Sequence, residues 1–295
     1  MDYQQICIDS ALAGGNAVEL VKSVETIRKK DSLQHHSIVT NADHDSQKAI
    51  LEIIHSNDPD SLFMTEEHVP ELLHGRMMVK NTLDRLKDSG VYIIDELDGT
   101  SSRRIGHYEW SISVGYVKNL VNLSAAIYAP DVYGGALFYA SKGRGGFIRT
   151  GIKTGKTIDT KMQVQKNSLE DSYLIFGVDC NLPRYPIHNK LMHMLAEKAR
   201  TTNSNGSCAL PLGLVAAGRA DALIQPPQSP WDYAAGKLLV EEAGGKVIFY
   251  EIQDGKIIPI ERLEPRHYNP EIKAVGFVAA NPSLAKEIMD YLVKI

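Results

Sequence analysis

The chain has 295 residues, enough for about two domain-sized units and a large hydrophobic core. Its composition, 43% hydrophobic and 23% charged residues, is that of an ordinary globular protein. The formal net charge of -4 argues against binding to a nucleic-acid polymer, which usually needs a basic patch. An anionic substrate stays open, because a bound metal can supply positive charge locally.

The first half of the chain predicts two helices and then a largely antiparallel sheet. Apolar residues at three- and four-residue spacing indicate the first helix, and tight turns between later strands favour antiparallel pairing. Helices are expected at residues 2–29, 43–55 and 70–88. Strands are expected at residues 61–67, 91–97, 110–117, 123–130 and 135–143.

The second half alternates strands and helices, which is typical of α/β layering. Strands are expected at 173–178 and 221–226, and helices at 187–200, 209–217 and from 231 onward. A closing helix follows a last strand, with Asn281 as its cap and Pro282 in its first turn. No flexible linker separates the halves, so we expect one unit over 1–295 with lobes at about 1–160 and 161–295.

The cysteines and the N-terminus favour a cytoplasmic protein. Cys7, Cys180 and Cys208 are an odd number without C-x-x-C spacing, which indicates free thiols with a packing role in a reducing compartment. No apolar run approaches the roughly 18 residues of a membrane helix, so no membrane partner is expected. The first ten residues lack the basic and apolar segments of a signal peptide.

An acidic stretch, VYIIDELDGTSSRRIG, occupies residues 91–106 and places carboxylates directly after an apolar run. Carboxylates at the end of a buried strand repel one another and are costly to desolvate. Three explanations compete: a solvated turn, a calcium loop and a site for bound cations. The calcium loop fails, because an EF-hand that begins at Asp95 would place Leu97 and Gly99 where oxygen ligands are needed.

Asp95 and Asp98 lie three residues apart where the strand gives way to a turn, so both can converge on one point above the strand end. Magnesium typically takes one or two such carboxylates and keeps waters for a substrate phosphate. Gly99 allows a close backbone approach, and the N–H groups of Thr100 and Ser101 would form an anion site if these residues open a helix. From spacing alone, a solvated turn and a metal site stay as alternatives.

Two further segments have simple structural explanations. In SPWDYAAG, Ser229 and Pro230 can begin a helix whose capping box includes Asp232, although a capping carboxylate can also bind a metal. GIKTGKT at 151–157 resembles a phosphate-binding loop, but three residues separate its glycines where that motif needs four. We expect an exposed hairpin loop there.

In chain order, TEE (65–67), DELDGT (95–100) and WDYAAG (231–236) resemble the motifs of the inositol monophosphatase family, which shares a superfamily with fructose bisphosphatase and bisphosphate nucleotide phosphatases. The family pattern is an acid pair after a strand, then D-P-[IL]-D-G-T, and far downstream W-D-x-[AG]-[AG]. Flanking segments such as IVTNADHDSQ and GFVAANPSL also match, so the resemblance covers nearly the whole chain. It implies a layered αβαβα sandwich of the sugar-phosphatase type, with a mixed or antiparallel N-terminal sheet and a smaller C-terminal α/β lobe.

The resemblance also implies hydrolysis of a small phosphate monoester with two or three Mg²⁺ ions. Carried over by position, Glu66, Asp95 and the carbonyl of Leu97 would hold the first ion. The second would bind Asp95, Asp98 and Asp232, and Glu66 would serve a third through water. The attacking water would be oriented by Thr100 with Asp43 behind it, while the amides of Gly99 and Thr100 would hold the phosphate. Lithium inhibition and a homodimer are also implied.

The chain departs from the family pattern at several positions. Glu96 replaces the usual proline, and it is expected either to point away from the metals or to tune their affinity. Gln225 stands where inositol phosphatases carry a glutamate that touches the inositol hydroxyls. Arg103 and Arg104 could meet a second phosphate, and His107 is a candidate for a substrate contact, although solvated side chains explain all three.

Three functions therefore compete. The leading one is a magnesium-dependent phosphomonoesterase of the inositol monophosphatase type, and a bisphosphate nucleotide or sugar phosphate is an alternative substrate. The third function is of a different class: the protein would be a catalytically inactive family member that acts as a binding protein.

Overall fold

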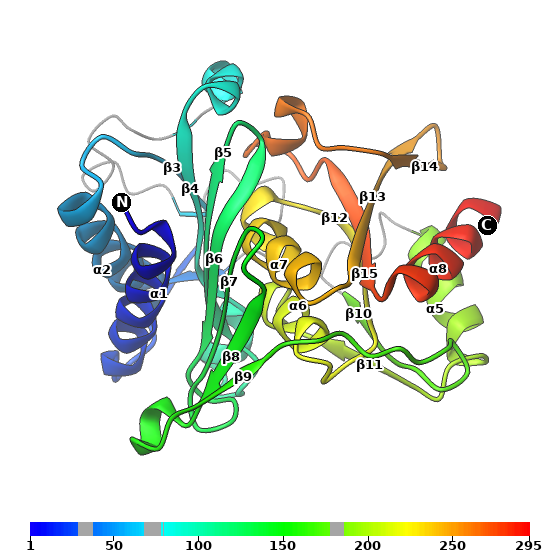
Figure 1. The fold of residues 1–295 in the computed structure, drawn as a ribbon, viewed down its shortest axis with the longest axis horizontal. Coiled ribbons are helices and arrows are strands. Elements are labelled where there is room, and N and C mark those ends of the chain that lie inside the picture. Colours follow the sequence, from blue (N-terminus) through cyan, green and yellow to red (C-terminus); the bar gives the residue numbers. More distant parts are fainter. Residues whose placement is uncertain (29–37, 68–77, 79, 178–185) are drawn as a thin grey trace.

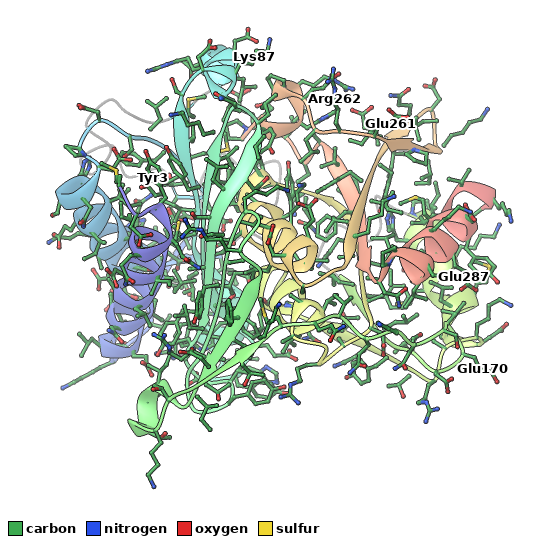
Figure 2. The ribbon with its side chains drawn as sticks, in the orientation of Figure 1. Tyr3, Lys87, Glu170, Glu261, Arg262 and Glu287 are labelled. Atoms are coloured by element: carbon green, nitrogen blue, oxygen red, sulfur yellow. The ribbon has the colours of Figure 1, made fainter. Side chains whose placement is uncertain are left out.

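The computed structural model describes residues 1–28, 38–67, 78, 80–177 and 186–295. These residues form five layers that alternate helices and sheets (Figure 1). Among the described residues, no helix has the length and apolar content needed to span a membrane. Charged side chains such as Lys87, Glu170 and Glu287 lie at the periphery of the molecule (Figure 2).

The first layer consists of the helices α1 (Tyr3–Leu20) and α2 (Asn41–Asn57), which pack against each other and against the first sheet. Helix α1 begins at Asp2, whose carboxylate accepts hydrogen bonds from the amides of Gln4 and Gln5. A two-stranded antiparallel sheet of β1 (Thr26–Arg28) and β2 (Ile38–Thr40) leads into α2.

The second layer is a seven-stranded sheet in the order β3-β4-β5-β6-β7-β8-β9. Strands β3 and β4 are parallel, and every later pair is antiparallel. Helices cover both faces, so the inner strands are apolar along nearly their whole length. The strands are β3 (Leu62–Thr65), β4 (Gly90–Asp98), β5 (Ser111–Lys118), β6 (Val121–Ala129), β7 (Ala136–Ser141), β8 (Gly146–Thr150) and β9 (Ile158–Lys161).

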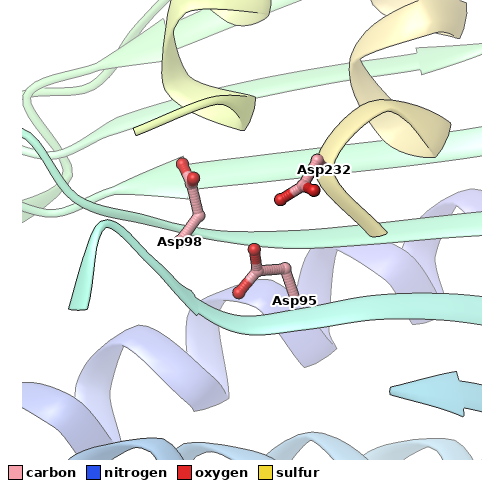
Figure 3. A group of neighbouring side chains, drawn as sticks. All are labelled: Asp95, Asp98 and Asp232. Carbon is pink, nitrogen blue, oxygen red and sulfur yellow. The ribbon is translucent and has the colours of Figure 1, made fainter. Parts of the chain in front are cut away.

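The central layer contains α6 (Ala209–Ala216) and α7 (Pro230–Glu242), which pack against each other and against both sheets. Nearly all of their side chains are buried, as expected of helices enclosed on two sides. The N-terminus of α7 points toward the end of β4, and this junction brings two distant parts of the chain together (Figure 3).

The fourth layer is a six-stranded mixed sheet in the order β11-β10-β12-β15-β13-β14, and the outer helices α5 (Pro186–Ala196) and α8 (Pro282–Lys294) form the fifth. Asn281 caps α8 by accepting from the amides of Ser283 and Leu284, as predicted. The strands are β10 (Tyr173–Gly177), β11 (Thr201–Asn205), β12 (Ala222–Gln228), β13 (Lys246–Gln253), β14 (Lys256–Ile260) and β15 (Val275–Ala280).

The layered fold class and most predicted elements are confirmed, but three of the expected helices differ. The helix expected over 2–29 ends at Leu20, and residues 26–28 form a strand instead. The helix expected over 187–200 ends at Ala196, and β11 was not predicted. Of the helix expected over 70–88, residues 80–87 form a 3₁₀ helix (η1), and residues 70–77 and 79 lie outside the described residues.

The segment 151–157 connects β8 to β9 as an exposed hairpin loop, as predicted. Gly151 and Gly155 both have positive φ angles and flank a single 3₁₀ turn (η2, Ile152–Thr154). Strand β9 follows this loop directly, where a phosphate-binding loop would lead into an α-helix, so the resemblance to such a loop has no structural basis.

Candidate active site

Three aspartates meet where the end of β4 faces the first turn of α7. One carboxylate oxygen from each of Asp95, Asp98 and Asp232 lies within 4.8 Å of the other two. Asp95 and Asp98 come from β4 and Asp232 from α7, and the three side chains point toward one another (Figure 3). Oxygen ligands in such a group suit a hard divalent cation.

A β-bulge allows two residues three apart on β4 to face the same side. Asp95 pairs with Ser113 of β5, and Asp98 pairs with Ser111, so the four residues 95–98 of β4 lie opposite the three residues 111–113 of β5. In a regular strand, residues three apart would point to opposite faces of the sheet. The extra residue removes this alternation, and the amide of Leu97 donates to Asp95 Oδ1 at 3.1 Å within the bulge.

Asp98 is held at the N-terminus of α6. Its carboxylate accepts from the backbone amides of Cys208 at 2.7 Å, Ala209 at 3.1 Å and Leu210 at 3.2 Å. The hydroxyls of Ser111 and Ser207 also donate to it. These five donors at the helix N-terminus fix the orientation of the carboxylate.

Asp232 combines the two roles considered from the sequence. The amide of Ser229 donates to Asp232 Oδ2 at 2.8 Å, which caps the first turn of α7. The side chain of Asp232 nevertheless faces Asp95 and Asp98. The cap therefore positions this carboxylate within the group of three.

Thr100 and Asp43 form a hydrogen-bonded pair beside the aspartates. Thr100 Oγ1 lies 3.0 Å from Asp43 Oδ1 and 2.9 Å from the carbonyl oxygen of Leu97. Asp43 Oδ2 accepts from both the amide and the hydroxyl of Thr40, at 2.8 and 2.6 Å. Since both neighbours of Thr100 Oγ1 are acceptors, the hydroxyl donates its one proton to either of them, and its lone pairs are available to another donor.

Burial raises the pKa values of Asp95, Asp232 and Asp43. For Asp95, burial is the largest cause, followed by the charges of Glu66 and Asp98, and its pKa lies well above the usual range. Burial raises the pKa of Asp232 to about 7, although the positive charge of Lys273 opposes this shift. The pKa of Asp43 is also raised by burial, against hydrogen bonds from Thr40 and Thr100 that lower it. Bound cations would offset this unfavourable charge density.

These shifts predict that the metal-free protein loses stability as the pH rises. Folded Asp232 binds its proton more tightly than the unfolded chain does, so its contribution to stability falls between the ordinary pKa of 3.8 and about 7. We expect a decrease of about 1 kcal/mol per pH unit in this window. Thermal unfolding at pH 5 and 7.5, with a chelator and with Mg²⁺, measures it.

Mg²⁺ should raise the unfolding temperature more at pH 7.5 than at pH 5, because the carboxylates must be ionised to bind it. Asp232→Asn should have a flatter pH dependence than the wild type. A metal-free wild type whose pH dependence matches that of this variant would contradict the prediction.

The aspartates line a pocket of about 510 Å³ that opens between the two sheets. Of the residues predicted for the site, it also contains Glu66, Leu97, Gly99, Thr100 and Gln225, and Asp43 lies behind Thr100. Several other lining residues could not be predicted from the sequence, because no local motif marks them. They include Gly177, Asn205, Ser207, Gln228 and Lys273.

Glu96 faces away from the pocket, in agreement with one of the two expectations. Its Oε1 accepts from Gln47 Nε2 at 2.7 Å, and its carbonyl accepts from the hydroxyl of Ser46, both on α2. The amide of Glu67 approaches Glu96 Oε2 at 3.4 Å. Burial and the nearby charge of Glu67 raise the pKa of Glu96 well above its usual range. Glu96 therefore links α2 to the ends of β3 and β4.

The structure does not place Arg103, Arg104 or His107 in the pocket. The guanidinium of Arg103 donates to the carbonyl of Val18 at 3.3 Å and lies 5.4 Å from the centre of the Trp110 ring. Arg104 is exposed, and His107 stacks on a neighbouring tyrosine. Arg103 is thus directed toward the end of α1, and neither arginine lines the pocket where a second phosphate of the substrate would lie.

The cysteines behave as predicted where the structure describes them. Cys7 and Cys208 are buried and free, and burial raises the pKa of both thiols. Cys180 lies outside the described residues.

Comparisons with known proteins agree on one protein family. A family model described as the inositol monophosphatase family matches residues 2–294. The chain is 29% identical to the inositol-1-monophosphatase of Bacillus subtilis, over 94% of this chain and 91% of the relative. It is 32% identical to the Nus factor SuhB of Haemophilus influenzae, over 86% of this chain and 89% of that relative. A solved IMPase of Thermotoga maritima has the same fold, with a TM-score of 0.74 at 24% identity over 100% of this chain and 98% of that one.

Proposed function

The chain belongs to the inositol monophosphatase family, and from this premise we propose that it is a Mg²⁺-dependent phosphatase that hydrolyses a small phosphate monoester. One observation carries the proposal: three carboxylate oxygens lie within 4.8 Å of one another beside the Thr100–Asp43 pair. A solvated turn would not bury Asp95 and Asp98 or raise the pKa of Asp95. A phosphate ester hydrolyses extremely slowly without catalysis, and the pocket gathers the groups that such a reaction needs.

The residues present fit magnesium. Asp95, Asp98 and Asp232 supply hard oxygen ligands, and Glu66 and the carbonyl of Leu97 line the same pocket. Two to three Mg²⁺ ions held there would neutralise the phosphate, lower the pKa of the attacking water and stabilise the departing alkoxide. The raised pKa of Asp95 in the metal-free protein supports a site that is completed by cations.

The chain's own residues would position the reactants. Asp43 holds the Thr100 hydroxyl so that its oxygen can accept a hydrogen bond from the attacking water. The backbone amides of Gly99 and Thr100, at the turn after β4, would donate to the phosphate oxygens. Phosphoryl transfer depends mainly on such positioning and on charge stabilisation, and it requires no covalent nucleophile.

Thr100→Ala is expected to lower kcat by about a hundredfold while changing the Mg²⁺ requirement little, because the hydroxyl orients water and is not a proposed metal ligand. Thr157→Ala is the matched control, since this threonine is exposed in the hairpin loop and does not line the pocket. Initial rates at saturating Mg²⁺ compare the two variants. Equal rates for Thr100→Ala and the wild type would remove Thr100 from the mechanism.

A substrate panel tests the proposal as a whole. Phosphate release is measured from inositol 1-phosphate, a sugar phosphate and adenosine 3′,5′-bisphosphate, with Mg²⁺, with a chelator and with added lithium. We expect release from at least one ester that requires Mg²⁺ and falls as lithium rises. Release that persists in the chelator would contradict the metal assignment. The homodimer and the cytoplasmic location stay predictions.

A second candidate function follows from the relatives named Nus factor SuhB, a name that describes a factor rather than an enzyme. A role of that kind requires no turnover, so this candidate corresponds to a binding protein. The panel separates the two functions. Protein that binds one of the esters and releases no phosphate from any of them would favour the binding protein.

A further inference from the structure

One wall of the pocket consists of hydrogen-bond donors that the proposed mechanism does not use. Lys273, Gln228 and Gln225 line this wall. Lys273 Nζ donates to Gln228 Oε1 at 3.1 Å, and Gln228 Nε2 donates to Gln225 Oε1 at 3.3 Å. Among the described residues that line the pocket, Lys273 is the only cationic side chain. We call these three residues the donor wall.

The lysine sets the direction of the hydrogen bonds in the donor wall. An ammonium group can only donate, so Gln228 must present its oxygen to Lys273 and its nitrogen to Gln225. Gln225 therefore accepts with its oxygen, and its NH₂ group is left as the part that can contact a ligand. A glutamate at this position would offer acceptors to substrate hydroxyls, whereas Gln225 in this network offers a donor.

The backbone holds Gln225 and Gln228 on one side of β12. Gln225 pairs with Phe277 of β15 and Gln228 pairs with Val275, so a bulge places two residues three apart on the same side, as it does for Asp95 and Asp98. The amide of Gln225 lies against Gly177, where an added Cβ would be 1.5 Å from Gln225 Oε1. Gln225 is 2% exposed, so its position is well defined.

The donor wall and the aspartates share one pocket. Lys273 is close enough to Asp232 for its charge to act on that carboxylate, and Asp232 belongs to the group of three. A phosphate held beside Asp95 and Thr100 would therefore leave the rest of the substrate near the donor wall. Donors with one positive charge favour a group with acceptors and negative charge over a neutral hydroxyl.

We propose that Lys273, Gln228 and Gln225 bind a second anionic group, a carboxylate or a second phosphate, on the leaving group of the substrate. This inference rests on the proposed function, because it assumes that the reacting phosphate lies beside the aspartates. It makes Lys273 a specificity-determining residue and makes phosphorylated acids or bisphosphates the preferred substrate class.

Two pairs of esters test the proposal. Glycerol 2-phosphate and 2-phosphoglycerate differ only in a hydroxymethyl group against a carboxylate, and glucose 1-phosphate and glucose 1,6-bisphosphate differ in a second phosphate. We expect the wild type to have a kcat/KM about ten- to a hundredfold higher for the anionic member of at least one pair, mainly through a lower KM. The pair that shows the preference identifies the anionic group.

Lys273→Met, which removes the charge and keeps most of the length of the side chain, should abolish this preference, because kcat/KM should fall much more for the anionic member of the pair than for the neutral one. Lys273→Arg should retain most of the preference. If Lys273→Met lowers kcat/KM equally for the neutral and the anionic esters, Lys273 acts on the reacting phosphate or on Asp232, and the proposal is wrong. A wild type without any preference would also overturn it.

Failure of the proposed function would look different. If no ester releases phosphate, the same pairs are titrated calorimetrically into wild-type and Lys273→Met protein in the presence of Mg²⁺. The donor wall predicts at least about tenfold tighter binding of the anionic member to the wild type, and the loss of this difference in the variant. Equal affinities for both members in the wild type would overturn the inference independently of catalysis.

Discussion

Asp95→Asn is expected to lower Mg²⁺-dependent phosphate release on the order of a thousandfold and, in metal-free buffer, to raise the unfolding temperature. The loss of activity follows because Asp95 belongs to the group of three and is the residue that the family resemblance assigns to two metal positions. Removing one ligand would forfeit several kcal/mol of charge stabilisation in the transition state. Rates at several Mg²⁺ concentrations separate weaker metal binding from slower chemistry.

The gain in stability has a separate cause. Asp95 is buried against Glu66, Asp98 and Asp232, so its ionised form is unfavourable without cations. Asparagine has nearly the same shape, and its oxygen can still accept from the amide of Leu97. Removing the charge should therefore stabilise the metal-free protein by about 1–2 kcal/mol at pH 7.5. Added Mg²⁺ should stabilise the wild type more than the variant.

Asp290→Asn is the matched control. Asp290 lies exposed on α8 and forms only a surface ion pair with Lys286, so the same change should leave activity and stability nearly unaltered. An Asp95→Asn protein with normal turnover would remove the aspartates from the active site. If the metal-free variant is less stable than the metal-free wild type, neighbouring groups of the protein already compensate the charge of Asp95.

Gly99→Ala is expected to damage both stability and activity. Gly99 has a φ of 84°, and an added Cβ would lie 2.5 Å from the carbonyl oxygen of Glu109. The left-handed backbone and the contact together should destabilise the protein by about 2–5 kcal/mol. The change would also displace the turn between Asp98 and Thr100, and a misplacement of about 1 Å can lower turnover a hundredfold.

Gly106→Ala separates backbone strain from the steric contact. Gly106 has a φ of 77°, close to that of Gly99, but an added Cβ would have no atom within 4 Å. This variant should lose only about 1–2 kcal/mol and keep its activity. Thermal unfolding and initial rates compare the two variants. Equal effects of both substitutions would mean that the contact with Glu109 does not matter.

The fold and the acidic part of the site could be predicted because their signals are local. The apolar run before Asp95, the glycine at 99 and the capping pattern around Asp232 each depend on a few neighbouring residues. The αβαβα layers followed from the resemblance to the family, and they are confirmed by the fold. The division into lobes at about residue 160 stays a prediction.

The missed elements lacked a distinct local signal. Val24 and Ile27 continue the apolar spacing of α1, but the chain leaves the helix at Val21, and Ile27 is exposed on a short strand. Strand β11 has the sequence TTNSN and lies at the edge of its sheet, so it shows no apolar alternation. In both cases tertiary packing decides the structure.

The donor wall could not be predicted for a related reason. Lys273 precedes β15 and Gln228 ends β12, and no sequence motif joins them. The bulge between Gln225 and Gln228 depends on pairing with β15, which the sequence does not reveal. Conversely, Arg103 and Arg104 lie close to the acids in sequence, but the fold directs Arg103 toward α1 and Trp110.

The central claim is that the aspartates form a divalent-cation site, and anomalous diffraction from crystals soaked in Mn²⁺ tests it most directly. Mn²⁺ takes the oxygen ligands that Mg²⁺ takes, and its anomalous signal locates it. We predict at least one peak within about 2.0–2.3 Å of carboxylate oxygens from Asp95, Asp98 and Asp232. Mn²⁺ bound elsewhere, with no peak among these aspartates in protein that hydrolyses phosphate esters, would contradict the claim.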